Sequence, residues 1–404
     1  MKSFSSEFFK QNRLALRQSI GDESPIILSA NGVIQRAGDS GYPFRQDSNF
    51  WYLTGLSVPD VTLVITQKTE FLILPERDPI LDYFEGAIDV GALRKTSGID
   101  QIMSHHEGWE HLRLVITKSK CLYTAIVKGF DARHSIYINP SKPRLISRLR
   151  KLSNDVEIVD IRKNLTHLRM VKQSVEIGAI ENSIQVTIGA FSEIFRDGWY
   201  EKNNSEALIS ARLGFEFAKR DGEHAYPPIV ASGKSACTLH YDKNNQPIGD
   251  NDSLLVDAGA EVGMYASDIT RVYSPKKMSL LQNEVYEAVK DIQEYVISEL
   301  KPGVDIKEID KQVEKKIGQF LKLKKLITKQ EPAQIRKFYP HAVSHHLGLD
   351  VHDVADYSQP LAEGNVITVE PGIYIPEYGI GVRIEDDILI TKNGAKNLSA
   401  DLPS

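Results

Sequence analysis

Cysteine is almost absent from this chain, which has only Cys121 and Cys237 among its 404 residues. Two cysteines make no disulfide framework, and neither has the spacing of a metal-binding cysteine motif. Apolar runs such as residues 71–74 are far shorter than the roughly 20 residues that span a membrane. The N-terminal residues also lack the apolar stretch of a signal peptide. We therefore expect a cytoplasmic protein with free thiols and no membrane partner.

A strong charge of either sign is absent as well. The chain has 49 Lys and Arg against 54 Asp and Glu, which gives a formal net charge of -5. This balance offers no electrostatic reason to expect nucleic acid or an anionic membrane as a partner. Its 41% hydrophobic and 25% charged residues are typical of a globular protein. The length is too great for one average domain, so we expect two.

The first part of the chain alternates strand-like and helix-like segments. Residues 61–66 and 71–74 are apolar and are separated by a polar turn, which predicts a β-hairpin. Residues 156–160 predict another strand. A long helical pattern follows, and we place a domain boundary before it. The sequence predicts an N-terminal mixed α/β domain over residues 1–165 and a C-terminal domain of the α/β (α+β) class over residues 166–404.

Two helices are clear in the second part. A periodic segment over residues 281–300 predicts a helix that ends at Lys301-Pro302-Gly303. Asp305 is the expected N-cap of the next helix, because aliphatic residues follow it at helical spacing. These aliphatic residues are expected to lie in the core.

The second part also contains a faint internal repeat. Residues 256–259 (Val-Asp-Ala-Gly) resemble residues 369–372 (Val-Glu-Pro-Gly), and an apolar run precedes each. Each segment leads through a glycine-containing turn towards a second acid, Asp268 in the first case and Glu385 in the second. The pattern predicts one structural unit used twice in a pseudo-symmetric sheet. A cleft between the two halves is then a natural ligand site.

The four acids of this repeat are candidate metal ligands. We expect Asp257 and Asp268 to face each other across a hairpin, although either could simply cap a turn. The period of two places Arg383 and Glu385 on one strand face. Glu370 ends a nearly apolar strand, where an unpaired charge is costly. A salt bridge between Glu370 and Arg383 is the structural alternative.

Histidines complete the candidate site. Four of the eleven histidines, His341, His345, His346 and His352, lie within twelve positions, and His240 lies in a loop containing Gly and Ser. Neutral imidazole is a good ligand for Mn, Co, Zn or Fe. Several carboxylates meeting at one point would repel each other, and a pair of divalent cations would resolve that repulsion. An oxygen-rich set with one imidazole favours Mn²⁺, with Co, Zn or Fe as alternatives.

Taken in order, these segments resemble the pita-bread metallopeptidases and, within them, the aminopeptidase P family. The resemblance rests on five blocks: residues 255–259, 266–271, the histidine segment, 368–372 and 383–387. Residues 44–55 and Glu85-Gly86 resemble the accessory domain of that family, which would be the N-terminal domain here. The resemblance implies a pseudo-symmetric pita-bread catalytic domain.

The resemblance also implies a role for each site residue. Asp257 would bind one metal ion, His345 and Glu370 the other, and Asp268 and Glu385 would bridge both. His240, His341 and His352 would contact the substrate and move protons, and Arg383 would hold the inner carboxylates or the substrate. The implied enzyme is a metalloaminopeptidase that releases the first residue from peptides with proline in second position. A homodimer or a tetramer is expected by analogy.

Other members of the same fold are the alternatives. Prolidase shares the ligands but cleaves Xaa-Pro dipeptides, and Ser344 before His345 favours aminopeptidase P. Methionine aminopeptidase usually lacks the N-terminal domain. Creatinase-type enzymes and non-catalytic binding modules lose acids that this chain retains.

Overall fold

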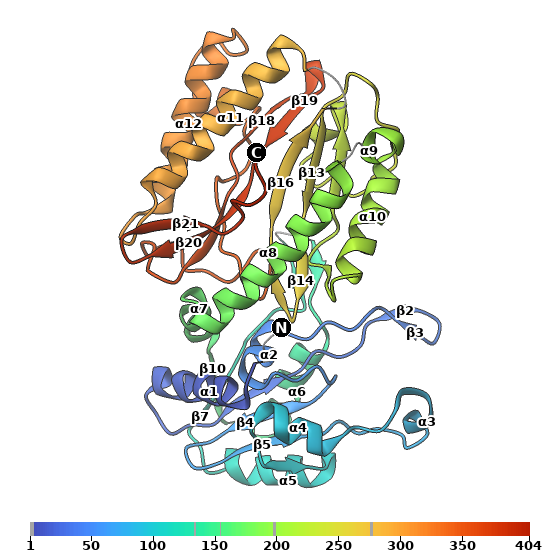
Figure 1. Cartoon of the computed structure of the whole chain (residues 1–404). Helices are drawn as coiled ribbons and strands as arrows, with labels where there is room; N and C mark the ends of the chain where they lie inside the picture. The colour runs from blue at the N-terminus through green and yellow to red at the C-terminus, as the bar shows by residue number, and fades with distance from the viewer. Residues whose placement is uncertain (1–3, 133–134, 154, 197–198, 275–277) are drawn as a thin grey trace. The chain divides into compact units, whose positions relative to one another are not determined.

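The computed structural model describes residues 4–132, 135–153, 155–196, 199–274 and 278–404 (Figure 1). The chain forms two compact units, of which the first ends at Leu168 and the second begins at Arg169. This division falls inside helix α7 (Arg162–Met170). The predicted boundary between the accessory domain and the catalytic domain, at residues 165 and 166, stays a prediction.

A six-stranded sheet in the order β10-β7-β1-β4-β5-β6 forms the centre of the N-terminal unit. Only β4 runs antiparallel to its neighbours. The strands are β1 (Ile26–Ser29), β4 (Thr62–Ile65), β5 (Glu70–Ile73), β6 (Gln101–Met103), β7 (Cys121–Thr124) and β10 (Glu157–Asp160). The predicted hairpin is confirmed as the β4–β5 pair, and the strand expected at residues 156–160 is confirmed as β10.

Helices cover this sheet because their apolar faces need a partner. Trp109 and Leu112 of α5 and Leu145 and Leu149 of α6 pack with strand residues such as Phe71 in one buried cluster. The helices of the unit are α1 (Ser6–Ile20), α2 (Ser48–Thr54), α3 (Leu81–Glu85), α4 (Val90–Ser97), α5 (His105–Ile116) and α6 (Ser141–Leu152). Two small hairpins complete it: β2 (Gln35–Ala37) with β3 (Ser40–Gly41), and β8 (Phe130–Asp131) with β9 (Ile136–Tyr137).

The C-terminal unit begins with a helix pair that contacts a set of short strands (Figure 1). The helices are α8 (Ser174–Phe195) and α10 (Glu206–Ala218), with the short α9 (Trp199–Lys202) between them. The strands are β11 (Glu223–His224), β12 (Ile229–Ser232), β13 (Leu254–Ala258), β14 (Ala260–Val262), β15 (Tyr265–Ala266) and β16 (Ile269–Tyr273).

A second helix pair contacts a second set of strands. The helices are α11 (Leu280–Glu299) and α12 (Ile306–Leu323), followed by the short α13 (Pro332–Ile335). The strands are β17 (Val366–Val369), β18 (Gly372–Ile375), β19 (Ile380–Arg383), β20 (Asp386–Thr391) and β21 (Gly394–Asn397). The predicted helix over residues 281–300 is confirmed as α11. The predicted cap is confirmed too, because the Asp305 carboxylate accepts a 2.9 Å hydrogen bond from the Lys307 N–H.

The two strand sets share one topology. In the first, β13 pairs with β16 and the inner strands β14 and β15 pair with each other. In the second, β17 pairs with β20 and the inner strands β18 and β19 pair with each other. The internal repeat that the sequence predicts is therefore present. No helix in the described ranges is long and apolar enough to cross a membrane.

Candidate metal centre

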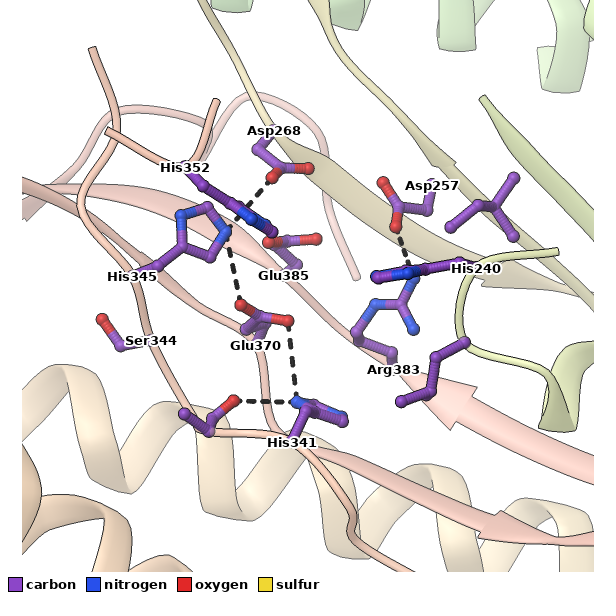
Figure 2. Close-up of a pocket in the computed structure, with 13 residues that line it drawn as sticks. His240, Asp257, Asp268, His341, Ser344, His345, His352, Glu370, Arg383 and Glu385 are labelled. Carbon is purple, nitrogen blue, oxygen red and sulfur yellow. Dashed lines mark hydrogen bonds and ion pairs between the residues drawn. The ribbon is translucent and has the colours of Figure 1, made fainter. Parts of the chain in front are cut away.

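One cavity of about 250 Å³ in the C-terminal unit is lined by every residue to which the sequence assigns a metal-ligand or catalytic role, whereas His346 does not line it (Figure 2). The five predicted metal ligands lining it are Asp257, Asp268, His345, Glu370 and Glu385, and the four predicted catalytic residues are His240, His341, His352 and Arg383. Segments more than one hundred positions apart in the sequence thus meet at one point. The role of each residue stays a prediction.

Three of these side chains lie close enough to share one ion. The ligand atoms of Asp268, His345 and Glu385 lie within 4.8 Å of one another. The Nε2 atom of His345 lies 3.4 Å from Oδ2 of Asp268 and 3.4 Å from Oε1 of Glu370 (Figure 2). A divalent cation bound about 2.1 Å from each ligand atom fits between groups at this spacing after small adjustments. Nδ1 of His345 lies 3.1 Å from the carbonyl oxygen of His346, which leaves Nε2 for a metal.

The repeated topology positions the four acids. Asp257 lies in β13, and Asp268 comes directly before β16, the strand that pairs with β13. Glu370 comes directly after β17, and Glu385 directly before β20, the strand that pairs with β17. Each half therefore supplies one acid where a strand ends and another where its partner begins. The side chains leave the apolar sheet at its edge, where they reach the cavity.

The expected hairpin register around Asp257 was wrong. Asp257 lies opposite Thr270, and Asp268 precedes the strand rather than facing Asp257 across it. The reason is the inner β14–β15 hairpin, whose turn at Gly263 and Met264 has positive φ at both residues. The chain turns back there, several residues beyond Asp257. Glu385 lies two positions beyond β19 and not in a strand with Arg383, but both side chains line the same cavity, as expected for residues on one face.

Arg383 forms an ion pair with Asp257. Its guanidinium also donates a 3.1 Å hydrogen bond to the hydroxyl of Thr270 and a 2.9 Å bond to that of Tyr374. The proposed alternative of a salt bridge between Glu370 and Arg383 is not found among the described residues. Glu370 instead faces His341 and His345 (Figure 2).

Burial and mutual repulsion make the charged form unfavourable for most of the carboxylates in this cavity. Burial, and repulsion from neighbouring acids, raise the pKa of Asp257, Glu370 and Glu385 despite the opposing charge of Arg383. Burial is also the largest single influence on Asp268 and opposes its ionisation, but the hydrogen bond and charge of His345, the hydrogen bond of Tyr226 and the charge of His352 together outweigh it, so the pKa of Asp268 is lowered. Burial disfavours the charged form of His345, whereas Asp268 and Glu370 raise its pKa to about 9. Four buried acids opposite one arginine and one imidazolium leave negative charge uncompensated.

The other three histidines surround this group. His341 lies with Nδ1 3.7 Å from Oε2 of Glu370 and Nε2 2.9 Å from the Tyr374 hydroxyl. Burial and the charge of Arg383 lower the pKa of His341 to about 4, so its ring is neutral near pH 7. The ring of His352 lies edge-on to that of His345, with 4.2 Å between their centroids. His240 comes from the loop after β12 and lies beside Asp257 (Figure 2).

Comparison with known proteins gives this geometry a context. The model of metallopeptidase family M24 matches residues 178–392, and that of the aminopeptidase P N-terminal domain matches residues 9–123. The chain belongs to metallopeptidase family M24. It is 35% identical to the Xaa-Pro aminopeptidase of Haemophilus influenzae, over 100% of this chain and 96% of that protein.

Solved structures agree over the whole chain. Aminopeptidase P from E. coli with the inhibitor Pro-Leu superposes with a TM-score of 0.87 at 31% identity, covering 99% of this chain and 96% of that one. Pseudomonas aeruginosa aminopeptidase PepP gives a TM-score of 0.89 at 28% identity, covering 100% and 97%. The expected fold class, an N-terminal mixed α/β accessory domain followed by a pita-bread catalytic domain, is confirmed. The protein is a metalloaminopeptidase, and its family implies divalent metal ions.

The residues present fit such ions. Hard carboxylate oxygens and one imidazole, buried or half-buried and short of compensating positive charge, form a donor set for divalent metals. Tyr226 supports this fit, because its hydroxyl lies 2.6 Å from Oδ1 of Asp257 and also bonds Asp268. The phenol thus contacts one carboxylate oxygen of each acid and orients both towards the cavity.

Sequence reasoning missed three polar residues of this site. Tyr226 follows no pattern that distinguishes it from other loop tyrosines. Thr270 donates a 2.6 Å hydrogen bond to Oε2 of Glu385, and Tyr374 links His341 to Arg383. Only Thr270 carried a usable signal, because it lies two positions after Asp268 and so shares its strand face.

Proposed function

We propose that this enzyme hydrolyses the Xaa-Pro bond and releases the N-terminal residue from peptides with proline in second position. The observation that carries the proposal is the convergence of the five ligands and three histidines on one cavity. The similarity to Xaa-Pro aminopeptidase over the full chain supports the same specificity.

Two divalent ions would be held by residues from both halves of the pita-bread domain. Asp257 would bind one ion, His345 and Glu370 the other, and Asp268 and Glu385 would bridge them. We favour Mn²⁺, with Co, Zn or Fe as alternatives, because the donor set is rich in oxygen and has one imidazole. Such a pair supplies hydroxide near neutral pH and polarises the scissile carbonyl.

The chain's own residues would complete the reaction. Neutral His341 would contact the substrate, but its one N–H, at Nδ1, lies 2.8 Å from the carbonyl oxygen of Ala342, so it would donate to the oxygen that gains negative charge only by exchanging that contact. His352, edge-on to His345, and His240 both line the cavity and could carry the proton that the leaving proline nitrogen requires. Arg383 would keep Asp257 oriented. Proline is acceptable after the scissile bond if the site demands no N–H there, which proline lacks.

A neighbouring cavity supports substrates longer than dipeptides. It has a volume of about 640 Å³ and shares Ala342, Ser344 and His345 with the metal centre. Residues beyond proline would extend into it, towards Lys307 and Lys311 on α12. Prolidase, the alternative, needs no such room.

Exposed apolar side chains support self-association. In the N-terminal unit, the adjacent residues Tyr83 and Phe84 are 90% and 79% exposed, and Tyr137, which is 83% exposed, contacts Phe130 with 5.0 Å between their ring centroids. Large apolar side chains grouped on a surface commonly mark interfaces. We therefore propose a homodimer or tetramer and, from the composition, a cytoplasmic enzyme without a nucleic-acid or membrane partner.

The test is hydrolysis of an Xaa-Pro-Xaa tripeptide and of the matching Xaa-Pro dipeptide, with and without Mn²⁺. Metal-dependent release of the first residue from the tripeptide, lost in Asp268→Ala, is expected. Asp291→Ala, an exposed acid of α11, is the matched control and should keep full activity. Cleavage of the dipeptide alone would transfer the assignment to prolidase.

A further inference from the structure

A second cavity, of about 230 Å³, lies within the N-terminal unit and shares no lining residue with the metal centre. Its floor includes Ser29, the last residue of β1, and Thr62, with which Ser29 pairs on β4. Residues 74–76, directly after β5, form one edge. Because β1 and β5 both run antiparallel to β4, the cavity lies at the carboxyl ends of two parallel strands. Open α/β sheets bind small ligands at this position.

Helix α6 provides the positive charge of the cavity. Arg144 and Arg148 lie one turn apart and therefore on one face of the helix. The guanidinium of Arg148 lies 3.7 Å from the centroid of the Trp109 ring and 2.9 Å from Nε2 of His105. A guanidinium can only donate, so this histidine nitrogen accepts. Among the described residues neither arginine has a carboxylate oxygen within 4.0 Å, although the charge of Glu76 acts on Arg148 from farther away, so both can still bind an anionic group.

Two carboxylates provide the negative charge. Asp60 accepts a 3.0 Å hydrogen bond from the hydroxyl of Ser141, at the start of α6. Glu76 is exposed at the edge formed after β5. Ser141 and Arg148 are seven positions apart, which is about 10 Å along the helix axis. The two carboxylates and the two arginines that line the cavity carry equal and opposite charge. Asp60 lies at the start of α6 and Arg148 about two turns further along it, so the negative and positive groups are separated.

An unsatisfied hydroxyl supports a ligand here. Ser29 is 6% exposed, and within the described part of the chain its Oγ has no hydrogen-bond partner. Its carbonyl oxygen, in contrast, accepts a hydrogen bond from the buried Lys142 ammonium. Buried hydroxyl groups in folded proteins are nearly always paired, and an exception points to a missing partner. Ser29 lines the cavity, so a polar atom of a bound molecule would be that partner once the Oγ, which has almost no accessible surface here, turns towards it.

We propose that this cavity binds a small zwitterion, a free amino acid or a dipeptide. Its carboxylate would meet Arg144 and Arg148, and its ammonium would meet Asp60 and Glu76. A simple anion or cation would satisfy only one of these pairs. The volume is below the roughly 300–1,000 Å³ of pockets for drug-sized ligands, which argues against a nucleotide. Aminopeptidases release free amino acids, so this cavity would bind a product of the enzyme's own reaction. Only this consequence, and not the binding itself, rests on the proposed function.

The test is calorimetric titration of the full-length, metal-loaded protein with L-alanine and with Ala-Ala, whose comparison separates the two ligand sizes. Acetate and ethylammonium, each carrying one of the two charges, should bind at least ten-fold more weakly. Arg148→Gln should weaken zwitterion binding at least ten-fold. Arg150→Gln is the matched control, because Arg150 is exposed on α6 and does not line the cavity.

The metal centre must be excluded as the binding site, so the titration is repeated with Asp268→Asn. Binding that persists in Asp268→Asn and is lost in Arg148→Gln supports the proposal, whether or not the enzyme cleaves Xaa-Pro bonds. Ser29→Ala removes no side-chain hydrogen bond found in the described residues, so it should fold normally and still weaken binding several-fold. Loss of binding in Asp268→Asn alone, equal binding of acetate, or no binding of either zwitterion would overturn it.

Discussion

Thr270 donates a 2.6 Å hydrogen bond to Glu385, which joins a strand of the first half of the catalytic domain to a ligand from the second. The same hydroxyl accepts from Arg383. Thr270→Val keeps the shape of the side chain and removes both bonds. Groups that orient metal ligands typically change metal affinity or activity 10- to 100-fold, so we expect kcat/KM to fall by about ten-fold or more. Thr270→Ser should restore most of the activity, and a fully active Thr270→Val enzyme would contradict this role.

Tyr226 offers a second test of ligand orientation. Its hydroxyl bonds both Asp257 and Asp268, so Tyr226→Phe leaves two buried acids without their shared donor. We expect metal affinity to fall by about 10- to 100-fold, as for other groups that orient metal ligands. Competition with a chelator, read by metal analysis, measures this. Tyr378→Phe, at a 63% exposed tyrosine, should leave metal affinity unchanged.

Metal-free protein should show an inverted pH dependence of stability. The pKa of Glu370 is raised to about 7 by burial, and those of Asp257 and Glu385 are also raised. The folded state then binds more protons than the unfolded state, whose Glu pKa is about 4.3, so stability falls as pH rises between these values. Thermal unfolding of the chelated protein from pH 4.5 to 7.5 should show this fall, offset in part below about pH 6.5 by His341 and His346, whose lowered pKa values act in the opposite direction, and metal should suppress it. A metal-free protein that gains stability over this range would refute the expectation.

A buried ion network near the histidine segment should contribute to stability. Asp353 pairs with Arg169 and, at 3.0 Å, with Lys172, and all three side chains are buried. Asp353→Asn leaves two buried cations without their shared partner, which typically costs about 3–5 kcal/mol. Denaturant unfolding measures this loss.

The same network contains its own control. Asp350 also bonds Arg169, at 2.8 Å, but its side chain is 37% exposed. An exposed pair contributes about 0–1 kcal/mol, so Asp350→Asn should destabilise far less. Equal losses of unfolding free energy in Asp353→Asn and Asp350→Asn would show that burial does not determine how much each ion pair stabilises the protein.

Local patterns predicted much of this fold. The cap at Asp305 and the β4–β5 hairpin depend on neighbouring residues, and both were found. The proposed ligand acids were recognisable as candidates because acids at the ends of apolar strands are costly without a partner, and the structure brings them to one cavity. The register opposite Asp257 was not predictable in this way, because strand periodicity defines faces but not the length of an inserted hairpin.

The partners of the ligands were harder to predict still. Arg383 bonds Asp257, 126 positions away, and no periodicity distinguishes that pairing from the alternative with Glu370. Tyr226 likewise acts only through contacts that folding creates. Such residues emerge from tertiary structure, where one side chain can satisfy groups from several strands.

The duplicated strand arrangement has a mechanical consequence. Asp257 and Asp268 come from one copy, and His345, Glu370 and Glu385 follow α12 and belong to the other. Ions bound among them would act as a cross-link between sequence-distant copies, closing loops of about a hundred residues. Loading the centre would then make the catalytic domain unfold as a single cooperative block, whereas the emptied domain would be free to open along the seam between its copies.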